Sequence, residues 1–429
     1  MSGGSKPNMG ASDQPERGAE SPSSAAGRRA TVVAICMPGD GHVQRLLPVV
    51  EGLCARGHTV HVMAHLRSRA KIERTGAHFI DLFTRHPVEA VDPTSRPVPS
   101  RWVTFAGMYA EALTEEVAPL APGLILYDTF TVVGPVIARR LGIPYVNVCA
   151  GHAAVPARVR AALRDDPRVA TSAECWEAVR RLEEIYGMRG ANPFSYVDAM
   201  SPYLNLYGEP EEYLSSEDRG AFEPIAFFGS LAPSLRENGQ AAVFPPERRG
   251  LRIYVSFGTV VWWYFASVAE AALQVISETL SGSGADAVIA LGSHPLKADA
   301  RALLERPNVR VVDYVDQWAA LREADLFITH NGLNSTHEAI YHLVPMISYP
   351  FFTDQPALAR RCHELGLAVP LGDAPQATVE SAALLSALKR LHDERALFVS
   401  RLTEARSWEL RTIADRDDIF DRIIALTRA

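Results

Sequence analysis

The stretch that decides the fold is residues 325–355, DLFITHNGLNSTHEAIYHLVPMISYPFFTDQ. Its first apolar run, residues 326–329, predicts a strand of a parallel sheet that is buried on both faces. The polar residues after it predict a tight turn and then a helix with Asn334 as its N-cap. A second strand is predicted at 346–350. This order of strand, turn, helix and strand is typical of one half of a nucleotide-binding α/β unit.

The start of this predicted helix suits a phosphate group. The first backbone N–H groups of a helix have no partner within the helix and carry a partial positive charge. Gly332 lets the backbone approach an anion closely, and His330 stands at the carboxyl end of the strand. Glu338, about one turn into the helix, has the carboxylate that binds ribose hydroxyls in nucleotide sites. A Rossmann-like unit with a purely structural helix cap is the alternative, but it does not require these residue types together.

The same stretch resembles the signature of the GT-B glycosyltransferases that include plant secondary-product enzymes and bacterial antibiotic or macrolide glycosyltransferases. That signature reads H-x-G-x-N-S-x-x-E, then V-P-M, a proline at the strand end, and D-Q. The matching residues are His330, Gly332, Asn334, Ser335, Glu338, Val344, Pro345, Met346, Pro350, Asp354 and Gln355. The resemblance implies an α/β fold with two Rossmann-like, doubly wound domains facing across a cleft. In that family a C-terminal helix crosses back onto the N-terminal domain.

The resemblance also implies a site for a nucleoside-diphosphate sugar. The diphosphate and ribose would be held by His330, Gly332, Asn334, Ser335 and Glu338. Asp354 and Gln355 would bind the hydroxyls of the sugar. The run Tyr314-Val315-Asp316-Gln317 resembles the family's W-x-P-Q, so Tyr314 would stack on the base and Gln317 would lie beside the base and ribose. Because tyrosine and aspartate replace tryptophan and proline, the base stays open, and UDP- or dTDP-linked sugars are the expected donors.

A histidine and an aspartate stand out in the N-terminal half. His42 lies where a strand predicted at 31–36 gives way to a helix, which is where ligands bind in doubly wound sheets. A histidine there can be a general base or a helix cap. Asp128 ends another predicted strand and can orient His42 or cap the next helix. The resemblance implies the catalytic pair, although Gln44-Arg45-Leu46 replaces the family's proline after the histidine.

Two further features follow the first strand of the C-terminal half. The turn Ser256-Phe257-Gly258-Thr259 resembles the family's S-F-G-S/T turn, which implies that Thr259 approaches the diphosphate; alone, it is an ordinary glycine turn. Residues 262–265 are four consecutive aromatics, too many for one buried helix face. They are expected either to line the cleft or to pack between domains.

The chain has 429 residues, enough for two or three domains. Composition and periodicity divide it into segments. These are a disordered tail at 1–28, an acceptor-binding Rossmann-like domain at 29–230, a linker at 231–250, a nucleotide-sugar-binding Rossmann-like domain at 251–411 and a terminal amphipathic helix at 412–429. Asp415-Arg416-Asp417 has the spacing of a metal-binding D-x-D, but we place it on the solvated face of that helix and expect no metal.

Composition excludes several functions. A net charge of −7 argues against a nucleic-acid surface. No apolar run could span a bilayer and the N-terminus has no signal-peptide core, so stable membrane insertion is not expected. The five cysteines are scattered without C-x-x-C spacing, as expected for free thiols in the cytoplasm. The sequence leaves open whether the chain forms a homodimer.

The predicted reaction is an inverting transfer of a sugar from a nucleoside-diphosphate sugar to a hydroxyl group, with His42 as general base and no cofactor or metal. The acceptor is expected to be a small, partly apolar natural product, with residues 84–110 and 150–200 shaping its pocket. A nucleotide-sugar epimerase and a non-catalytic nucleotide-sugar-binding auxiliary protein remain alternatives. The first would have no acceptor pocket, and the second would tolerate loss of His42 and Asp128. A dinucleotide dehydrogenase is disfavoured because no G-x-G-x-x-G follows a strand.

Overall fold

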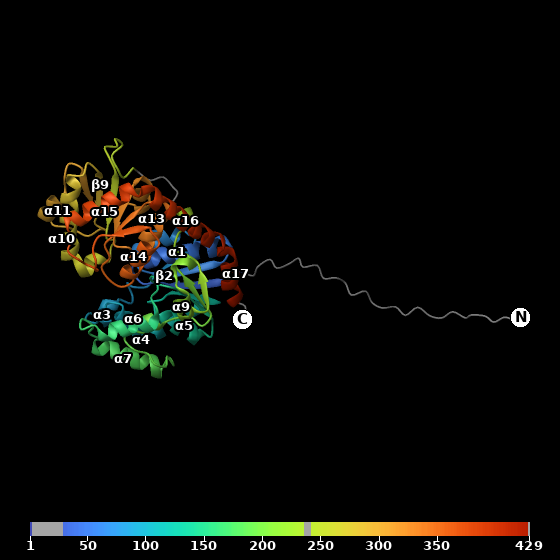
Figure 1. Cartoon of the computed structure of the whole chain (residues 1–429). Coiled ribbons are helices and arrows are strands. Elements are labelled where there is room, and N and C mark those ends of the chain that lie inside the picture. The colour runs from blue at the N-terminus through green and yellow to red at the C-terminus, as the bar shows by residue number, and fades with distance from the viewer. Residues whose placement is uncertain (2–28, 236–241, 428–429) are drawn as a thin grey trace.

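The computed structural model describes Met1 and residues 29–235 and 242–427. Apart from Met1, the tail predicted at residues 1–28 lies outside the described residues. Two parallel sheets, each with helices on both faces, form two Rossmann-like domains (Figure 1). The predicted α/β class is therefore confirmed.

The N-terminal sheet has seven parallel strands in the order β3-β2-β1-β4-β5-β6-β7. They are β1 (Thr31–Ile35), β2 (Thr59–Ala64), β3 (His78–Asp81), β4 (Leu124–Asp128), β5 (Tyr145–Val148), β6 (Leu204–Tyr207) and β7 (Ile225–Phe227). Side chains alternate between the two faces of a strand. In β1, Val33 and Ile35 therefore enter one apolar core, and Val32 and Ala34 enter the other. A sheet buried on both faces explains why its strands are almost wholly apolar.

Nine helices of the described residues belong to this domain. They are α1 (Asp40–Ala55), α2 (Arg69–Glu73), α3 (Val88–Val91), α4 (Ser100–Val117), α5 (Val133–Leu141), α6 (Pro156–Asp165), α7 (Ala173–Glu184), α8 (Ser195–Asp198) and α9 (Ser216–Arg219). The insertion between β5 and β6 is helical and contains α6, α7 and α8. Residues 84–110, predicted to shape the acceptor pocket, contain α3 and the start of α4. Val88 in α3 is buried in the same core as α4, which gives this short helix its anchor.

The C-terminal sheet has six parallel strands in the order β10-β9-β8-β11-β12-β13. They are β8 (Arg252–Ser256), β9 (Asp286–Ala290), β10 (Val309–Val312), β11 (Leu326–Thr329), β12 (Met346–Ser348) and β13 (Ala368–Pro370). The helices are α10 (Val261–Ser281), α11 (Ala298–Leu304), α12 (Gln317–Glu323), α13 (Leu333–Tyr341), α14 (Gln355–Glu364), α15 (Ser381–Asp393), α16 (Arg395–Ala414) and α17 (Arg416–Leu426). In both sheets the strand order reverses direction beside the first strand, and this is where doubly wound folds bind ligands.

The last helix crosses back onto the N-terminal domain, as the resemblance implied. In Figure 1 the red helix α17 lies against the blue elements. Ile419, Phe420, Ile423 and Ile424 are buried in the core beneath β1 and α1. The ring of Phe420 lies so close to Gly52 of α1 that a Cβ there would meet it at 2.0 Å. This apolar face joins the two domains.

The predicted bounds of the terminal helix need correction. The predicted segment at 412–429 begins inside α16, and Ile413 belongs to α16 rather than to α17. The Asp415-Arg416-Asp417 triplet is not uniformly solvated either. The Arg416 guanidinium donates to the carbonyl oxygens of Phe228 and Leu231, both at 2.8 Å. Arg416 instead fastens the start of α17 to the N-terminal domain.

No helix of the described residues combines the length and apolar composition needed to cross a membrane. All five cysteines are unpaired, as expected from their spacing.

Candidate active site

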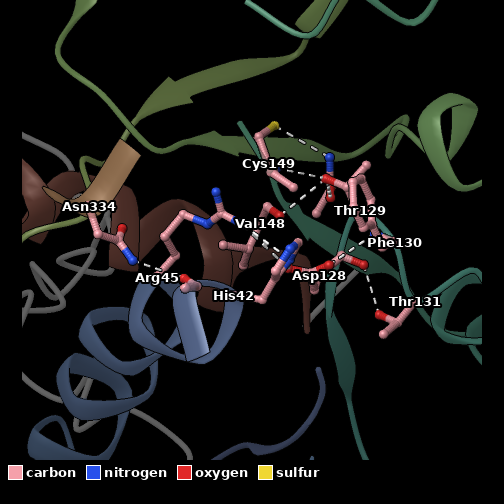
Figure 2. A network of polar contacts seen from close by, with 12 residues as sticks. His42, Arg45, Asp128, Thr129, Phe130, Thr131, Val148, Cys149 and Asn334 are labelled. Carbon is pink, nitrogen blue, oxygen red and sulfur yellow. Dashed lines mark hydrogen bonds and ion pairs between the residues drawn. The ribbon is translucent and has the colours of Figure 1, made fainter. Parts of the chain in front are cut away.

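The residues predicted as catalytic and as donor-binding face each other where the two domains meet. Helices α1 and α13 are in contact. The side-chain amide of Asn334 in α13 donates to the carbonyl oxygen of Gly41 in α1 at 3.0 Å, as drawn in Figure 2. Gln44, two residues after His42, lines the same interdomain gap as Asn334 and Glu338. The carboxyl edges of the two sheets therefore contribute to one site.

His42 and Asp128 form a hydrogen-bonded pair (Figure 2). His42 lies in the first turn of α1, and its Nδ1 is 2.5 Å from Oδ2 of Asp128 at the end of β4. Asp128 is buried, and its Oδ1 accepts the backbone N–H of Phe130 at 2.9 Å. Because Nδ1–H donates to the carboxylate, Nε2 is the nitrogen left to accept a proton. This is the orientation that a general base needs.

The capping alternatives for these two residues are wrong. Gly39 is the N-cap of α1, and its position is three residues before His42. Val132 is the N-cap of α5, so Asp128 does not cap the next helix. Neither side chain caps a helix, and the two side chains instead pair with each other.

Arg45 is a third member of this group that sequence reasoning missed. Its buried guanidinium places an Nη2 3.1 Å from Nδ1 of His42 and 4.0 Å from Oδ2 of Asp128. Nδ1 cannot both donate to Asp128 and accept from Arg45, so the shorter contact with Asp128 decides its tautomer. The signal was present, since residues three apart on a helix share a face, and Arg45 follows His42 at that spacing.

The charge of Asp128 is held by its neighbours. Burial alone would raise the pKa of this carboxyl group. His42, Arg45 and the backbone N–H of Phe130 outweigh burial, and the pKa of Asp128 lies below its ordinary value. Asp128 is therefore ionised at neutral pH and can stabilise an imidazolium that forms on His42.

The N-cap predicted for α13 is wrong. Gly332, in extended backbone conformation, precedes the helix, and Asn334 is its second residue. A Cβ at Gly332 would lie 2.3 Å from Nε2 of His330, so this close approach requires glycine. The first N–H groups of α13 have no side-chain cap, which keeps them available to an anion.

His330 is buried beside the start of α13. It follows β11 and is packed between the turns at Gly258 and Gly332. Burial lowers the pKa of His330 to about 4, so the imidazole is neutral at neutral pH. Its Nδ1 is buried without a hydrogen-bond partner among the described residues. Thr259 lies nearby, in the turn after β8, which pairs with β11.

Gln317, Ser335 and Glu338 are brought together by α12 and α13. The amide nitrogen of Gln317 donates to Oε2 of Glu338 at 2.8 Å and to Oγ of Ser335 at 3.1 Å. Tyr314, predicted to stack on the base, is 63% exposed. Asp316, which stands in place of the family's proline, caps α12 by accepting the backbone N–H of Trp318. Gln317, Ser335 and Glu338, three of the predicted donor-binding residues, therefore lie in one cluster.

The two predicted sugar-binding residues have different surroundings. Oδ2 of Asp354 accepts the backbone N–H of His152 from the N-terminal domain at 3.0 Å. Gln355, the first residue of α14, is buried, and its Oε1 accepts the N–H of Phe351 at 2.9 Å. Gln355 thus supports its own loop, and Asp354 stands at the domain interface.

The aromatic run at 262–265 divides between several environments. Trp262 is buried in the core of the C-terminal domain and stacks on His294 with ring centroids 4.6 Å apart. Trp263 is exposed. Phe265 contacts the ring of Phe352. Neither expectation therefore describes the whole run.

The structure contains two hollows relevant to ligand binding. The gap lined by Gln44, Asn334 and Glu338 holds only about 10 Å³, whereas ligand pockets measure roughly 300–1,000 Å³. A larger cavity of about 500 Å³ lies within the helical insertion of the N-terminal domain, lined by residues that include Arg160, Trp176 and Phe194. In the part of the chain that the structure describes, no three His, Cys, Asp or Glu side chains could jointly hold a metal ion.

Comparison with known proteins finds similar glycosyltransferases. The model of the family described as UDP-glucoronosyl and UDP-glucosyl transferase matches residues 237–406. An uncharacterized UDP-glucosyltransferase of Bacillus subtilis is 25% identical, over 93% of this chain and 98% of its own. The oleandomycin glycosyltransferase of Streptomyces antibioticus is 24% identical, over 92% and 95%. The crystal structure of the kitacinnamycin glycosyltransferase superposes with a TM-score of 0.71 and 23% identity, over 92% of this chain and 99% of that one.

Proposed function

We propose that the chain, whose residues 237–406 match the UDP-glucoronosyl and UDP-glucosyl transferase family and which has the GT-B fold, transfers a sugar from a nucleoside-diphosphate sugar to an acceptor hydroxyl with inversion. The observation that carries this proposal is the His42–Asp128 pair, which faces the open N-terminus of α13 across the domain interface. A general base and an anion site on opposite sides of one gap are what such a transfer requires.

The proposed step needs one base and one stabilised leaving group. Nε2 of His42 takes the proton of the acceptor hydroxyl, and the oxygen forms a bond to the anomeric carbon from the opposite side to the phosphate. The bond from that carbon to the phosphate oxygen breaks, and the nucleoside diphosphate leaves. Backbone N–H groups of α13, the Thr259 turn and the neutral His330 hydrogen-bond to the leaving diphosphate. Ionised Asp128 stabilises the imidazolium formed on His42.

The donor and acceptor can be proposed by class. The name of the matching family supports a UDP-linked sugar, and a dTDP-linked sugar is the second candidate; no further cofactor is proposed. The acceptor is proposed to be a small, partly apolar natural product, since the named relatives include glycosyltransferases of oleandomycin and kitacinnamycin. The cavity of about 500 Å³ lies within residues 150–200, the segment predicted to shape the acceptor pocket. We propose that the reaction takes place in the cytoplasm.

A thermal-shift panel tests the donor. A ligand that binds only the folded chain at about 100 times its Kd stabilises it by about 2.7 kcal/mol. We expect UDP or dTDP, and the corresponding glucose conjugates, to raise the melting temperature more than ADP or GDP does. A panel in which no nucleotide raises it would contradict the proposed function. For an active donor and acceptor pair, the anomeric configuration of the product, measured by NMR, then tests inversion.

A further inference from the structure

A buried network of four ionisable side chains crosses the domain interface. None of these four side chains belongs to the predicted site residues described above. His152 and Glu209 follow β5 and β6 of the N-terminal domain, and His337 and Glu409 lie in α13 and α16. Glu209 accepts from Nδ1 of His152 at 2.8 Å and from Nε2 of His337 at 3.0 Å. Nδ1 of His337 lies 2.5 Å from Glu409. All four side chains are at most 5% exposed.

The centre of this buried network is an ion pair in the protein interior. Burial by itself lowers the pKa of His337, but Glu409 and Glu209 outweigh it and raise the pKa to about 10. Contacts with His152 and His337 hold the pKa of Glu209 well below its usual range, although burial opposes them. An imidazolium from one domain is therefore held between carboxylates from both. Removing one partner of a buried pair leaves an uncompensated charge, so separation of the domains at this point is costly.

Both ends of the buried network contact elements that carry the proposed donor site. His337 lies on α13 between Ser335 and Glu338. At the other end, the backbone N–H of His152 donates to Asp354. The adjoining Gly151 has a φ of +84°, and a Cβ there would lie 2.9 Å from Oδ2 of Asp354, so the loop approaches Asp354 as closely as glycine permits.

The hollow lined by Gln44, Asn334 and Glu338 measures only about 10 Å³, far less than a ligand pocket needs. We propose that Glu209 is a positioning residue that couples the contact between the two domains to donor recognition. Through His337 it holds α13, and through His152 it holds the loop that meets Asp354. This inference rests on the proposed function, because it assumes that α13 and Asp354 bind a nucleotide sugar.

Glu209→Gln tests the coupling, with Glu212→Gln as its matched control. Both changes remove a carboxylate that the N-terminal domain presents to the C-terminal domain, but Glu212 pairs with Arg411, whose side chain is 54% exposed, and exposed ion pairs contribute little. In the ligand-free full chain, hydrogen exchange at the His152 amide and in α13 is expected to quicken about tenfold or more in Glu209→Gln and to stay near wild type in Glu212→Gln. Equal exchange in all three proteins overturns the inference.

Binding provides the second measurement. UDP-glucose and dTDP-glucose are titrated by calorimetry into wild type and both variants. Glu209→Gln is expected to lower the donor affinity about tenfold or more, which is the scale of one charge-assisted hydrogen bond. An unchanged donor affinity overturns the inference. If wild type binds neither donor, the proposed function fails, and the exchange measurement, which needs no ligand, still decides whether Glu209 holds the interface.

His152→Ala serves if Glu209→Gln does not fold, because it leaves the Glu209–His337–Glu409 core intact. It should lower the affinity for the sugar conjugate about tenfold while the affinity for the parent nucleoside diphosphate changes less than about twofold, since its loop meets Asp354 rather than α13. An equal loss for both ligands, or no loss for either, contradicts the positioning role.

The pH dependence of melting gives a further expected result. Glu209, Glu409 and Tyr213 contact His337 directly. His152 acts on Glu209, and Cys362 and Arg361 act on Tyr213 in the same buried group. A histidine whose pKa is raised in the folded state contributes its full stabilisation of the fold at pH values below its unfolded-state pKa of about 6.5. That contribution is lost as the pH rises toward the folded-state pKa of about 10. The melting temperature of wild type should therefore fall more steeply between pH 7 and pH 10 than that of His337→Gln. Parallel curves would show that His337 carries no such charge.

Discussion

Replacing His42 with alanine is expected to lower turnover by roughly two to four decades, the usual range for general-base catalysis. An alcohol is a poor nucleophile until its proton leaves, and Nε2 of His42 is the proposed proton acceptor. Donor affinity should hardly change, because His42 belongs to the domain opposite the diphosphate site. Steady-state kinetics give turnover, and calorimetry with UDP-glucose or dTDP-glucose gives donor affinity. His78→Ala, an exposed histidine on β3 of the same domain, is the matched control.

Asp128 tests whether the two residues act as one unit. Asp128→Asn should lower turnover by a similar or smaller factor, because the amide keeps the size of the side chain but loses the charge that stabilises an imidazolium. The double variant should be little worse than His42→Ala alone, since groups that act together are non-additive. Losses that multiply would mean independent roles. Near-normal turnover of His42→Ala would place the base elsewhere or leave a protein that only binds its nucleotide sugar.

Glu338→Ala is expected to weaken donor binding by about one to two decades, the equivalent of a lost charge-assisted hydrogen bond of roughly 1.5–3 kcal/mol. Glu338 is buried and already accepts from Gln317 at 2.8 Å, so ribose hydroxyls would meet an oriented carboxylate. Calorimetry measures the affinity, and the melting temperature of the ligand-free variant shows whether the fold is retained. Glu338→Gln keeps the volume of the side chain without its charge, so its donor affinity should lie between those of wild type and Glu338→Ala. An unchanged donor affinity in Glu338→Ala would remove this residue from the site.

The candidate site was partly predictable because its members stand at defined points of short patterns. His42 and Asp128 each lie at the carboxyl end of an apolar run, and parallel strands bring such ends to one edge of a sheet. This rule predicted that they could meet, and the structure places them 2.5 Å apart. Arg45 shares the helix face of His42, so its contact could also have been predicted from spacing. The catalytic and donor-binding roles of these residues stay predictions.

Other features depended on details that patterns do not contain. Asn334 is a favourable N-cap residue, but the N-cap lies two residues earlier, at Gly332, against which His330 packs. The freed side chain of Asn334 then reaches the other domain. Propensity is a weak local preference that packing overrides, and the packing partner of Gly332 is set by how β8 and β11 lie side by side.

The sequence by itself determined the alternation of apolar strands and amphipathic helices, and therefore the two doubly wound sheets and the positions of His42, Asp128 and the α13 turn. These follow from periodicity and from the limited connections that parallel strands allow. Only the tertiary structure decided the buried network through Glu209. Its contacts join Glu209 to His152, 57 residues away in the sequence, and to His337, 128 residues away. Those distances are bridged by the stacking of one domain on the other and by the return of α17. No local pattern specifies either, because each depends on which surfaces meet after both sheets have formed.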